Sequence, residues 1–385
     1  MRRWIVLGLS ALLAACSSAP VAPPAAPEPR LFHDALFAPP SQPIRAADVF
    51  ALDDDMRRYL HEQLRPRMRD GRQRTLIESL HQHGALRLEY DAATTRNARE
   101  AFAARTGNCL SLVLMTAAFA KELGLAVTYQ SAIVDETWSR SGNLYFVSGH
   151  VNIVLGRRPA QRSAYDAEQY LTVDFLPPEE LRGLRTRPIE EHTVLAMYMN
   201  NRAAEALVAG QVDDAYWWAR EALHQSSEFL STYNTLGVVY LHRRALAAAE
   251  QAFDHVLRRE PGNRQALANL ASALHQQGRH DESAAVKRRL AALEPEPPFH
   301  YFNLGMAALR SGDYPAARSY FAKEVDRAAY NHEFHFWLAV ASLQLGEVNE
   351  ARRQLKLALD NSTTRSDRDL YSAKLDRLKA ATQAH

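Results

Sequence analysis

The sequence predicts two folded units, an α+β domain followed by an all-helical repeat solenoid. The chain has 385 residues, a length that favours two domains at about 150 residues each. Residues 53–176 alternate between short helical and strand patterns, which indicates mixed architecture. The C-terminal half repeats with a period of 34 residues, which is typical of stacked helical units.

The composition excludes several classes of protein. Apolar residues make up 47% of the chain and charged residues 23%, so the chain is not a fully disordered one. Two cysteines form at most one bridge, which excludes a disulfide-built fold. Without Arg2 and Arg3, which lie in an expected cleaved segment, basic and acidic residues both number 44. A neutral protein lacks a basic footprint, and we expect no nucleic-acid partner.

Residues 1–15 are predicted to be a signal peptide, because two arginines precede an apolar stretch of twelve residues that is too short to span a membrane. The residues before the first cysteine, Leu13-Ala14-Ala15-Cys16, resemble the lipobox of bacterial lipoproteins. That resemblance implies cleavage before Cys16 and lipidation of its thiol. Ser17 resembles the outer-membrane sorting pattern, which implies an anchor on the periplasmic side of the bacterial outer membrane. The alternative is an ordinary cleaved signal with an incidental cysteine.

Residues 16–30 are expected to form a stalk behind the lipidated cysteine. They contain five prolines and few residues that could pack in a core. A proline-rich segment favours an extended, semi-rigid conformation, so it would hold the folded part away from the membrane.

Residues 31–178 are predicted to form the α+β domain. Its first elements are two helices, a short strand and a third helix, at residues 53–67, 74–83, 86–90 and 95–105. Leu110–Phe119 then has apolar residues on every helical face, so we expect that helix to be buried in the domain centre. Cys109 lies in its first turn, where the free amides favour a thiolate, and Gly107 is expected to leave room for a substrate.

Two strands follow with one titratable residue each. Residues 150–155 alternate His150 and Asn152 with three apolar residues, and residues 171–175 alternate Thr172 and Asp174 in the same way. If the strands are antiparallel neighbours, His150 and Asp174 can lie opposite each other and face Cys109. A thiolate, an imidazole base and an orienting carboxylate are the parts of acyl-transfer catalysis.

Gly107-Asn108-Cys109 before an apolar helix, Gly149-His150 in a strand and Val173-Asp174 in the next strand resemble the transglutaminase-like superfamily of papain-like folds. The resemblance implies a domain of helices and antiparallel sheet, with Cys109 as nucleophile, His150 as general base and acid, and Asp174 as orienting group. The superfamily includes crosslinking enzymes, cysteine peptidases, amidases and members that have lost activity. No upstream residue can be assigned as a second oxyanion donor.

Other interpretations of these residues stay open. Cys109 in an apolar helix could be an inert small hydrophobe, Asp174 could cap the turn before Pro177, and Asn152 could be a solvent-facing strand residue. The chain has no HExxH and no CxxC pattern, so we predict no catalytic metal and no cofactor.

The repeat is defined by turn residues, by small residues and by bulky residues, each at spacings of 34. The turn set is Gly210, Arg244, Gly278, Gly312 and Gly346; the small set is Ala203, Gly237, Ala271, Gly305 and Ala339; the bulky set is Ala219, Phe253, Lys287, Phe321 and Leu355. This pattern resembles the tetratricopeptide repeat. We expect a linker at residues 179–195, five units that fold as a stack at residues 196–365, and a capping helix with a tail at residues 366–385.

First helices usually line the groove of such an array. The corresponding positions predict an apolar lining by Phe299, Phe302, Met306 and Phe336 and a polar lining by Asn234, His242, Gln265 and His275. Such a groove suits an extended peptide or a partner helix. Alternatively, some of the aromatic residues close the stack or pack on the first domain.

These patterns together predict a membrane-anchored periplasmic cysteine enzyme that attacks a peptide or glutaminyl amide through a thioester, with repeats that bind a protein. Hydrolysis is favoured over amine transfer, because the sequence contains no recognisable amine site. The alternative is a non-catalytic adaptor lipoprotein that assembles partner proteins through its tetratricopeptide repeats.

Overall fold

The computed structural model describes residues 28–81, 88–92, 94–141, 144–156, 170–175 and 185–383. The expected signal peptide, Cys16 and most of the expected stalk lie outside the described residues, as does the first part of the expected linker. Among the residues that are described, no helix is both long enough and apolar enough to cross a membrane.

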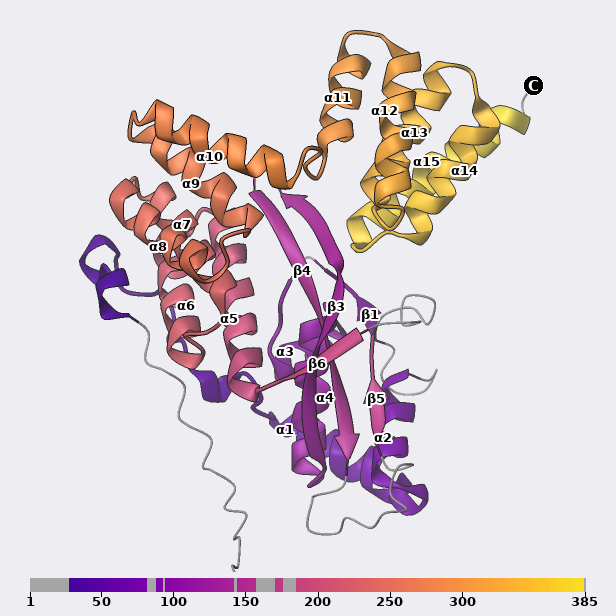
Figure 1. Ribbon diagram of the computed structural model, residues 1–385. Coiled ribbons are helices and arrows are strands. Elements are labelled where there is room, and N and C mark those ends of the chain that lie inside the picture. Colours follow the sequence, from indigo (N-terminus) through magenta and orange to yellow (C-terminus); the bar gives the residue numbers. More distant parts are fainter. Residues whose placement is uncertain are drawn as a thin grey trace, which may run out of the picture.

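The N-terminal part combines helices with an antiparallel four-stranded sheet of order β5-β4-β3-β6 (Figure 1). The strands β1 and β2 form a separate parallel pair. The elements are η1 (Pro29–Leu31), η2 (Asp34–Leu36), η3 (Ala46–Asp48), α1 (Asp54–Tyr59), η4 (Leu60–Leu64), η5 (Arg65–Asp70), α2 (Arg72–His81), β1 (Glu89–Tyr90), α3 (Ala98–Ala104), β2 (Thr106–Gly107), α4 (Cys109–Glu122), β3 (Ala126–Ser141), β4 (Leu144–Gly156), β5 (Leu171–Val173) and β6 (Arg185–Ile189).

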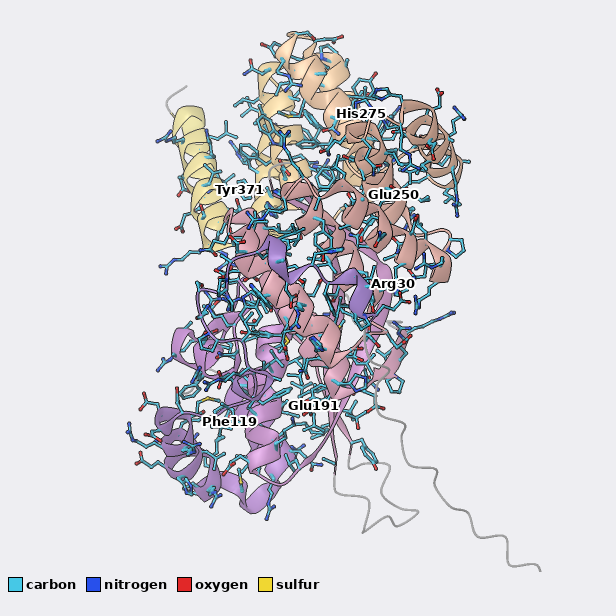
Figure 2. All side chains as sticks on the ribbon, turned by 90° about the vertical axis from the view of Figure 1, so that its left-hand side faces the viewer. Arg30, Phe119, Glu191, Glu250, His275 and Tyr371 are labelled. Atoms are coloured by element: carbon cyan, nitrogen blue, oxygen red, sulfur yellow. The ribbon has the colours of Figure 1, made fainter. Side chains whose placement is uncertain are left out.

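The helix α4 is the buried centre of this part, as the sequence predicts. Every residue from Leu110 to Ala120 is buried, and Phe119 lies inside the N-terminal part (Figure 2). The helix packs on β3 and β4, and residues of all three elements share one hydrophobic core. An apolar helix is stable here because protein surrounds it on all sides.

The C-terminal part is helical within residues 191–383, with helices in antiparallel pairs (Figure 1). The helices are α5 (Glu191–Val208), α6 (Val212–Gln225), α7 (Leu230–His242), α8 (Leu246–Arg259), α9 (Arg264–Gln276), α10 (His280–Leu293), α11 (His300–Arg310), α12 (Tyr314–Arg327), α13 (His332–Gln344), α14 (Val348–Asp360) and α15 (Arg365–Gln383). The pairs from α5/α6 to α13/α14 correspond to the five predicted units, and α15 follows as the predicted capping helix.

The turns inside the pairs require left-handed backbone at the predicted turn positions. Gly210, Arg244, Gly278 and Gly312 have φ angles of 75°, 59°, 78° and 79°. A residue with a Cβ is strained there, whereas glycine is not. The period of 34 residues therefore arises in part from the same left-handed turn, which recurs between the two helices of each unit.

We expect Gly278→Ala to lower the free energy of unfolding by about 1 kcal/mol and Arg244→Gly to leave it unchanged or raise it by up to about 1 kcal/mol. Nothing lies within 4 Å of a Cβ built at Gly278, so the loss would come from the backbone alone. Urea unfolding followed by circular dichroism measures both variants. A loss in both would contradict the strain assigned to Arg244.

The stack is interrupted between α10 and α11, whereas the sequence predicts that all five units fold as a stack. The hydrophobic cluster of the first three units ends at Val286 of α10, and a separate cluster begins at Phe299 before α11. At the bulky position of α10 the chain carries Lys287, which is exposed. The last two units instead return to the N-terminal part, where the amide of Ala92 donates to the carbonyl of Thr363 at 3.1 Å.

Residues 28–41, the N-terminal segment, pack on the first two repeat units. The ring of Phe37 stacks on that of Tyr216 with centroids 3.9 Å apart, and the hydroxyl of Tyr240 donates to the carbonyl of Leu31 at 2.6 Å. Figure 2 shows Arg30 beside the repeat helices. The expected stalk and the start of the expected first domain thus include a segment held by α6, α7 and α8.

The helix α5 belongs to both parts of the molecule. Val194 and Met199 lie in the core that contains α4, whereas Ala203 and Leu207 lie in the core of the first repeats. At its start, Glu191 accepts a hydrogen bond from the hydroxyl of Tyr129 on β3 at 3.0 Å. The first repeat helix is therefore built into the N-terminal part.

Candidate functional site

Cys109 is the first residue of α4 and is half-buried. The side chain of Asn108 caps the helix, because its Oδ1 accepts the amide of Ser111 at 2.9 Å. A Cβ at Gly107 would lie 2.6 Å from the Cβ of Ser111, so the absent side chain is needed for this close approach. Gly107 therefore serves the turn before the helix, whereas the sequence predicts that it leaves room for a substrate.

His150 and Asp174 form a buried ion pair across β4 and the end of β5. The Nε2 atom of His150 lies 2.7 Å from Oδ1 of Asp174, and both side chains are less than a tenth exposed. The register pairs Ile153 with Val173, which brings Asp174, the next residue, opposite Asn152. The strands are antiparallel neighbours as expected, but His150 reaches Asp174 diagonally and does not lie opposite it.

Asn152 is a site residue that sequence reasoning missed. The strand pattern allows it to face solvent, yet it is 2% exposed and its Nδ2 donates to Oδ2 of Asp174 at 2.9 Å. His150 and Asn152 thus each engage one carboxylate oxygen, which excludes the alternative that Asp174 only caps a turn. The signal was present in the sequence, because Asn152 lies two residues from His150 on the same face of the strand.

Cys109 joins this pair through the imidazole. Burial lowers the pKa of His150, but hydrogen bonds to Asp174 and to Cys109, with the charges of both groups, raise it to about 9. Because Nε2 faces Asp174, Nδ1 is the ring nitrogen left for the sulfur. The structure thus brings Cys109, His150 and Asp174 together, with the imidazole between the sulfur and the carboxylate.

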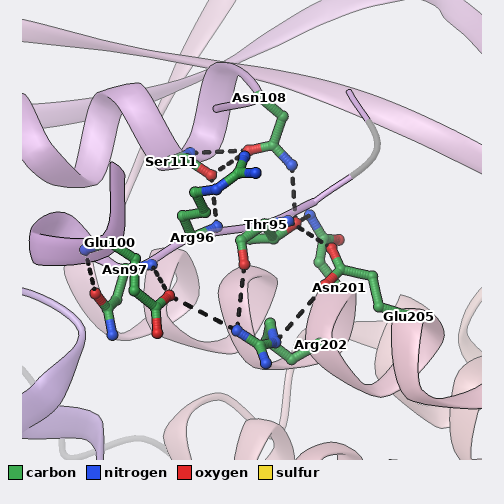
Figure 3. Close-up of polar contacts among 9 residues, drawn as sticks. All are labelled: Thr95, Arg96, Asn97, Glu100, Asn108, Ser111, Asn201, Arg202 and Glu205. Atoms are coloured by element: carbon green, nitrogen blue, oxygen red, sulfur yellow. Dashed lines mark hydrogen bonds and ion pairs between the residues drawn. The ribbon is translucent and has the colours of Figure 1, made fainter. Parts of the chain in front are cut away.

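The cap of α4 is part of a wider polar network (Figure 3). The Nδ2 of Asn108 donates to Oγ1 of Thr95 at 2.8 Å, and the amide of Arg96 donates to Oγ of Ser111 at 2.8 Å. Thr95, Asn97 and Ser111 are buried. The loop before α3 therefore holds the first turn of α4 in place.

No group of three or more histidine, cysteine, aspartate or glutamate side chains among the described residues is arranged to hold a metal ion. Two histidines outside the candidate site, His275 and His280, have their Nδ1 atoms 3.1 Å apart. Both residues are exposed at the turn between α9 and α10.

The predicted apolar lining of the groove is partly wrong. Phe299 and Phe302 are each 1% exposed and pack inside the fourth unit, Met306 packs against the same cluster, and Phe336 stacks on Tyr371 of the capping helix. These aromatic residues close the stack, which is the alternative interpretation. Exposed apolar residues on the first helices of the last two units are Leu304 of α11 and Leu343 of α13, at 38% and 45%.

The predicted polar positions are accessible to different degrees. His242 and His275 are exposed, and Gln265 is half-buried. The half-buried Asn234 accepts a hydrogen bond from Nδ2 of Asn269 on the next first helix, at 3.0 Å. The polar positions thus lie on first helices before the break between α10 and α11, and the exposed leucines lie on first helices after it.

Residues 234–298 and 302–366 match the family model of the tetratricopeptide repeat. These residues form tetratricopeptide repeats. The interval between the two matches, residues 299–301, lies at the break between α10 and α11. Cys109, His150 and Asp174 lie outside the matched residues, and no curated protein matches the chain.

Several solved repeat structures resemble the chain. A thermophilic TPR protein of Thermus thermophilus is 16% identical, over 47% of this chain and 98% of its own, with a TM-score of 0.30. PilF of Pseudomonas aeruginosa is 19% identical, over 49% and 94%, with a TM-score of 0.28. YrrB, described as a TPR protein with an unusual peptide-binding site, is 20% identical, over 47% and 92%, with a TM-score of 0.25.

Proposed function

We propose that the chain is a protein-binding adaptor whose tetratricopeptide repeats hold a polypeptide partner. The family match of the repeats is the observation that carries this proposal. The N-terminal segment contacts α6, α7 and α8 of the first two units, whereas Leu304 and Leu343 stay exposed on the first helices of the last two units. Exposed apolar side chains on first helices suit the binding of an extended peptide or an amphipathic helix.

Photo-crosslinking in cells tests the adaptor function. A photoreactive amino acid at position 304 or 343 is expected to give discrete protein adducts. Exposed apolar positions away from first helices, Leu293 at the end of the second helix α10 and Leu370 on α15, are matched controls and are expected to give none. Equal adduct patterns at all four positions, or no adduct at 304 and 343, would contradict binding by the first-helix surface.

A second candidate function is thiol-dependent acyl transfer at Cys109, and the buried His150–Asp174 pair in contact with Cys109 favours it. The Cys109 thiolate would attack an amide carbonyl, and His150 would protonate the departing amine. The resulting thioester would be cleaved by water, with His150 as the general base and Asp174 holding the ring. This chemistry agrees with the transglutaminase-like resemblance of the sequence, and hydrolysis remains preferred over amine transfer.

Alkylation of Cys109 by iodoacetamide tests the second function. In a Cys16→Ser background Cys109 is the sole cysteine of the chain. At about pH 6.5 we expect its alkylation to be roughly tenfold or more faster than that of free cysteine, and His150→Ala to remove the advantage, because the imidazolium stabilises the thiolate. His192→Ala, on α5, is the control. An equal rate in the His150→Ala variant and its parent would reject the catalytic function.

We also propose that the chain is anchored to the periplasmic side of the bacterial outer membrane through a lipidated Cys16. The support for this proposal is the lipobox resemblance of the sequence, and Cys16 itself lies outside the described residues. Cys16→Ser is expected to move the protein from the membrane fraction to the soluble fraction. A variant that stays entirely in the membrane fraction would contradict the anchor.

A further inference from the structure

Three residues of the first repeat helix bind one threonine beside the candidate thiol (Figure 3). On α5, Glu205 accepts the amide of Thr95 at 2.7 Å, Asn201 donates to its Oγ1 at 3.3 Å, and Arg202 donates to its carbonyl at 3.4 Å. Every polar group of Thr95 is therefore engaged by the repeat helix. Thr95 is only 1% exposed, so these partners replace water.

Thr95 also contacts the residue before α4, the helix that begins at Cys109. Its Oγ1 also accepts Nδ2 of Asn108 at 2.8 Å, and Asn108 precedes Cys109 and caps α4. With Nδ2 fixed by Thr95, Oδ1 of Asn108 points to the amide and hydroxyl of Ser111. Two hydrogen bonds thus connect α5 of the repeats to the residue that orients the first turn of α4.

The hydrogen bonds between α5 and Thr95 are costly to break, because they involve groups that are at least partly buried. Glu205 is half-buried, and its pKa is raised because burial outweighs the hydrogen bonds from Thr95 and the nearby charges of Arg202 and Arg96. Loss of the hydrogen bonds from Thr95 would leave this carboxylate less well satisfied, which is costly. The packing of α5 in the core of α4 also holds the two helices together.

We propose that Thr95, held by Asn201 and Glu205, is a positioning residue through which the repeat array sets the orientation of Cys109. This inference rests on the proposed thiol chemistry. It assigns the first repeat a role in the thiol site, because a shift of α5 would move Thr95, Asn108 and the first turn of α4 together.

The test compares Thr95→Val with Thr95→Ser in the full chain carrying Cys16→Ser. Valine has the shape of threonine without the hydroxyl, whereas serine keeps the hydroxyl that Asn108 and Asn201 bind. We expect iodoacetamide alkylation of Cys109 at about pH 6.5 to slow about fivefold or more in Thr95→Val, with its pH profile moved to higher pH, and Thr95→Ser to match the parent. A purely structural role would lower the melting temperature without moving the profile.

Asn201→Ala provides a second route if Thr95→Val does not fold, since the half-buried Asn201 contacts Thr95 from the repeat side alone. It is expected to slow alkylation in the same direction, whereas Val208→Ala at the exposed end of α5 is expected not to. Unchanged profiles in both Thr95→Val and Asn201→Ala, with alkylation still dependent on His150, would overturn the coupling and leave the thiol chemistry standing. Alkylation that is independent of His150 would instead overturn the thiol chemistry itself.

Discussion

Replacing Asp174 by alanine is expected to lower the free energy of unfolding by about 3 kcal/mol at about pH 6. The substitution leaves Nε2 of His150 and Nδ2 of Asn152 buried without the carboxylate that both engage. A buried charge or hydrogen-bond donor without a partner destabilises the folded state, because the same group would be hydrogen-bonded to water in the unfolded chain. Asp174→Asn, which keeps the shape and one acceptor oxygen, is expected to lose clearly less.

The loss should depend on pH in a direction set by His150. Hydrogen bonds to Asp174 and Cys109 outweigh burial and raise its folded pKa to about 9, from about 6.5 in the unfolded chain. The proton on His150 therefore stabilises the fold fully below about pH 6.5, and this stabilisation disappears as pH rises through about 9. Asp174→Ala removes a main cause of the raised pKa, so the gap to the parent is largest at low pH.

Urea unfolding at about pH 6 and about pH 9.5 measures this difference. We expect the gap between parent and Asp174→Ala to narrow by more than about 1 kcal/mol at the higher pH. A gap of the same size at both values would mean that Asp174 acts as a neutral packing element and not as the partner of an imidazolium.

The elements set by local pattern could be predicted from the sequence. The helix at Cys109 has apolar residues on every face, and the left-handed turns recur every 34 residues, so both follow from neighbours along the chain. The phases of the strands were enough to place His150 and Asp174 near Cys109. They were not enough to fix the register, which pairs Ile153 with Val173 and makes Asn152 the second partner of the carboxylate.

Contacts between distant segments could not be predicted in this way. The start of the N-terminal segment has the composition of a stalk. However, Phe37 packs on Tyr216, which is far away in the sequence, and no repeating pattern predicts such a contact. The hydrogen bond from Thr95 to Glu205 likewise connects the loop before α3 with α5, two segments that no local sequence pattern relates. The break after α10 was signalled by Lys287, the one charged residue among the five bulky positions, although a single charge did not outweigh a regular period.

The small and bulky sets of the repeats are complementary, pair by pair. A Cβ built at Gly237 would lie 2.3 Å from Cε1 of Phe253, and one built at Gly305 would lie 2.6 Å from Cε1 of Phe321. Glycine on the first helix thus occurs where the second helix carries phenylalanine at the bulky position. The other three units combine alanine with alanine, lysine or leucine, at 203/219, 271/287 and 339/355. The two helices of a unit have room for a phenylalanine ring at the bulky position or for a Cβ at the small position, but not for both.

Gly237→Ala is therefore expected to destabilise the protein by about 2 kcal/mol, because the fully buried ring of Phe253 cannot move away. The sign is informative, since alanine in a helix interior ordinarily stabilises by about 0.5–1 kcal/mol relative to glycine. Phe253→Leu alone should cost about 1–3 kcal/mol by opening a cavity. In the double variant, which recreates the alanine and leucine of the fifth unit, we expect the loss to fall at least about 1 kcal/mol below the sum of the single losses. Urea unfolding of all four proteins closes the cycle, and additive losses would mean that Gly237 is small for a reason other than the ring of Phe253.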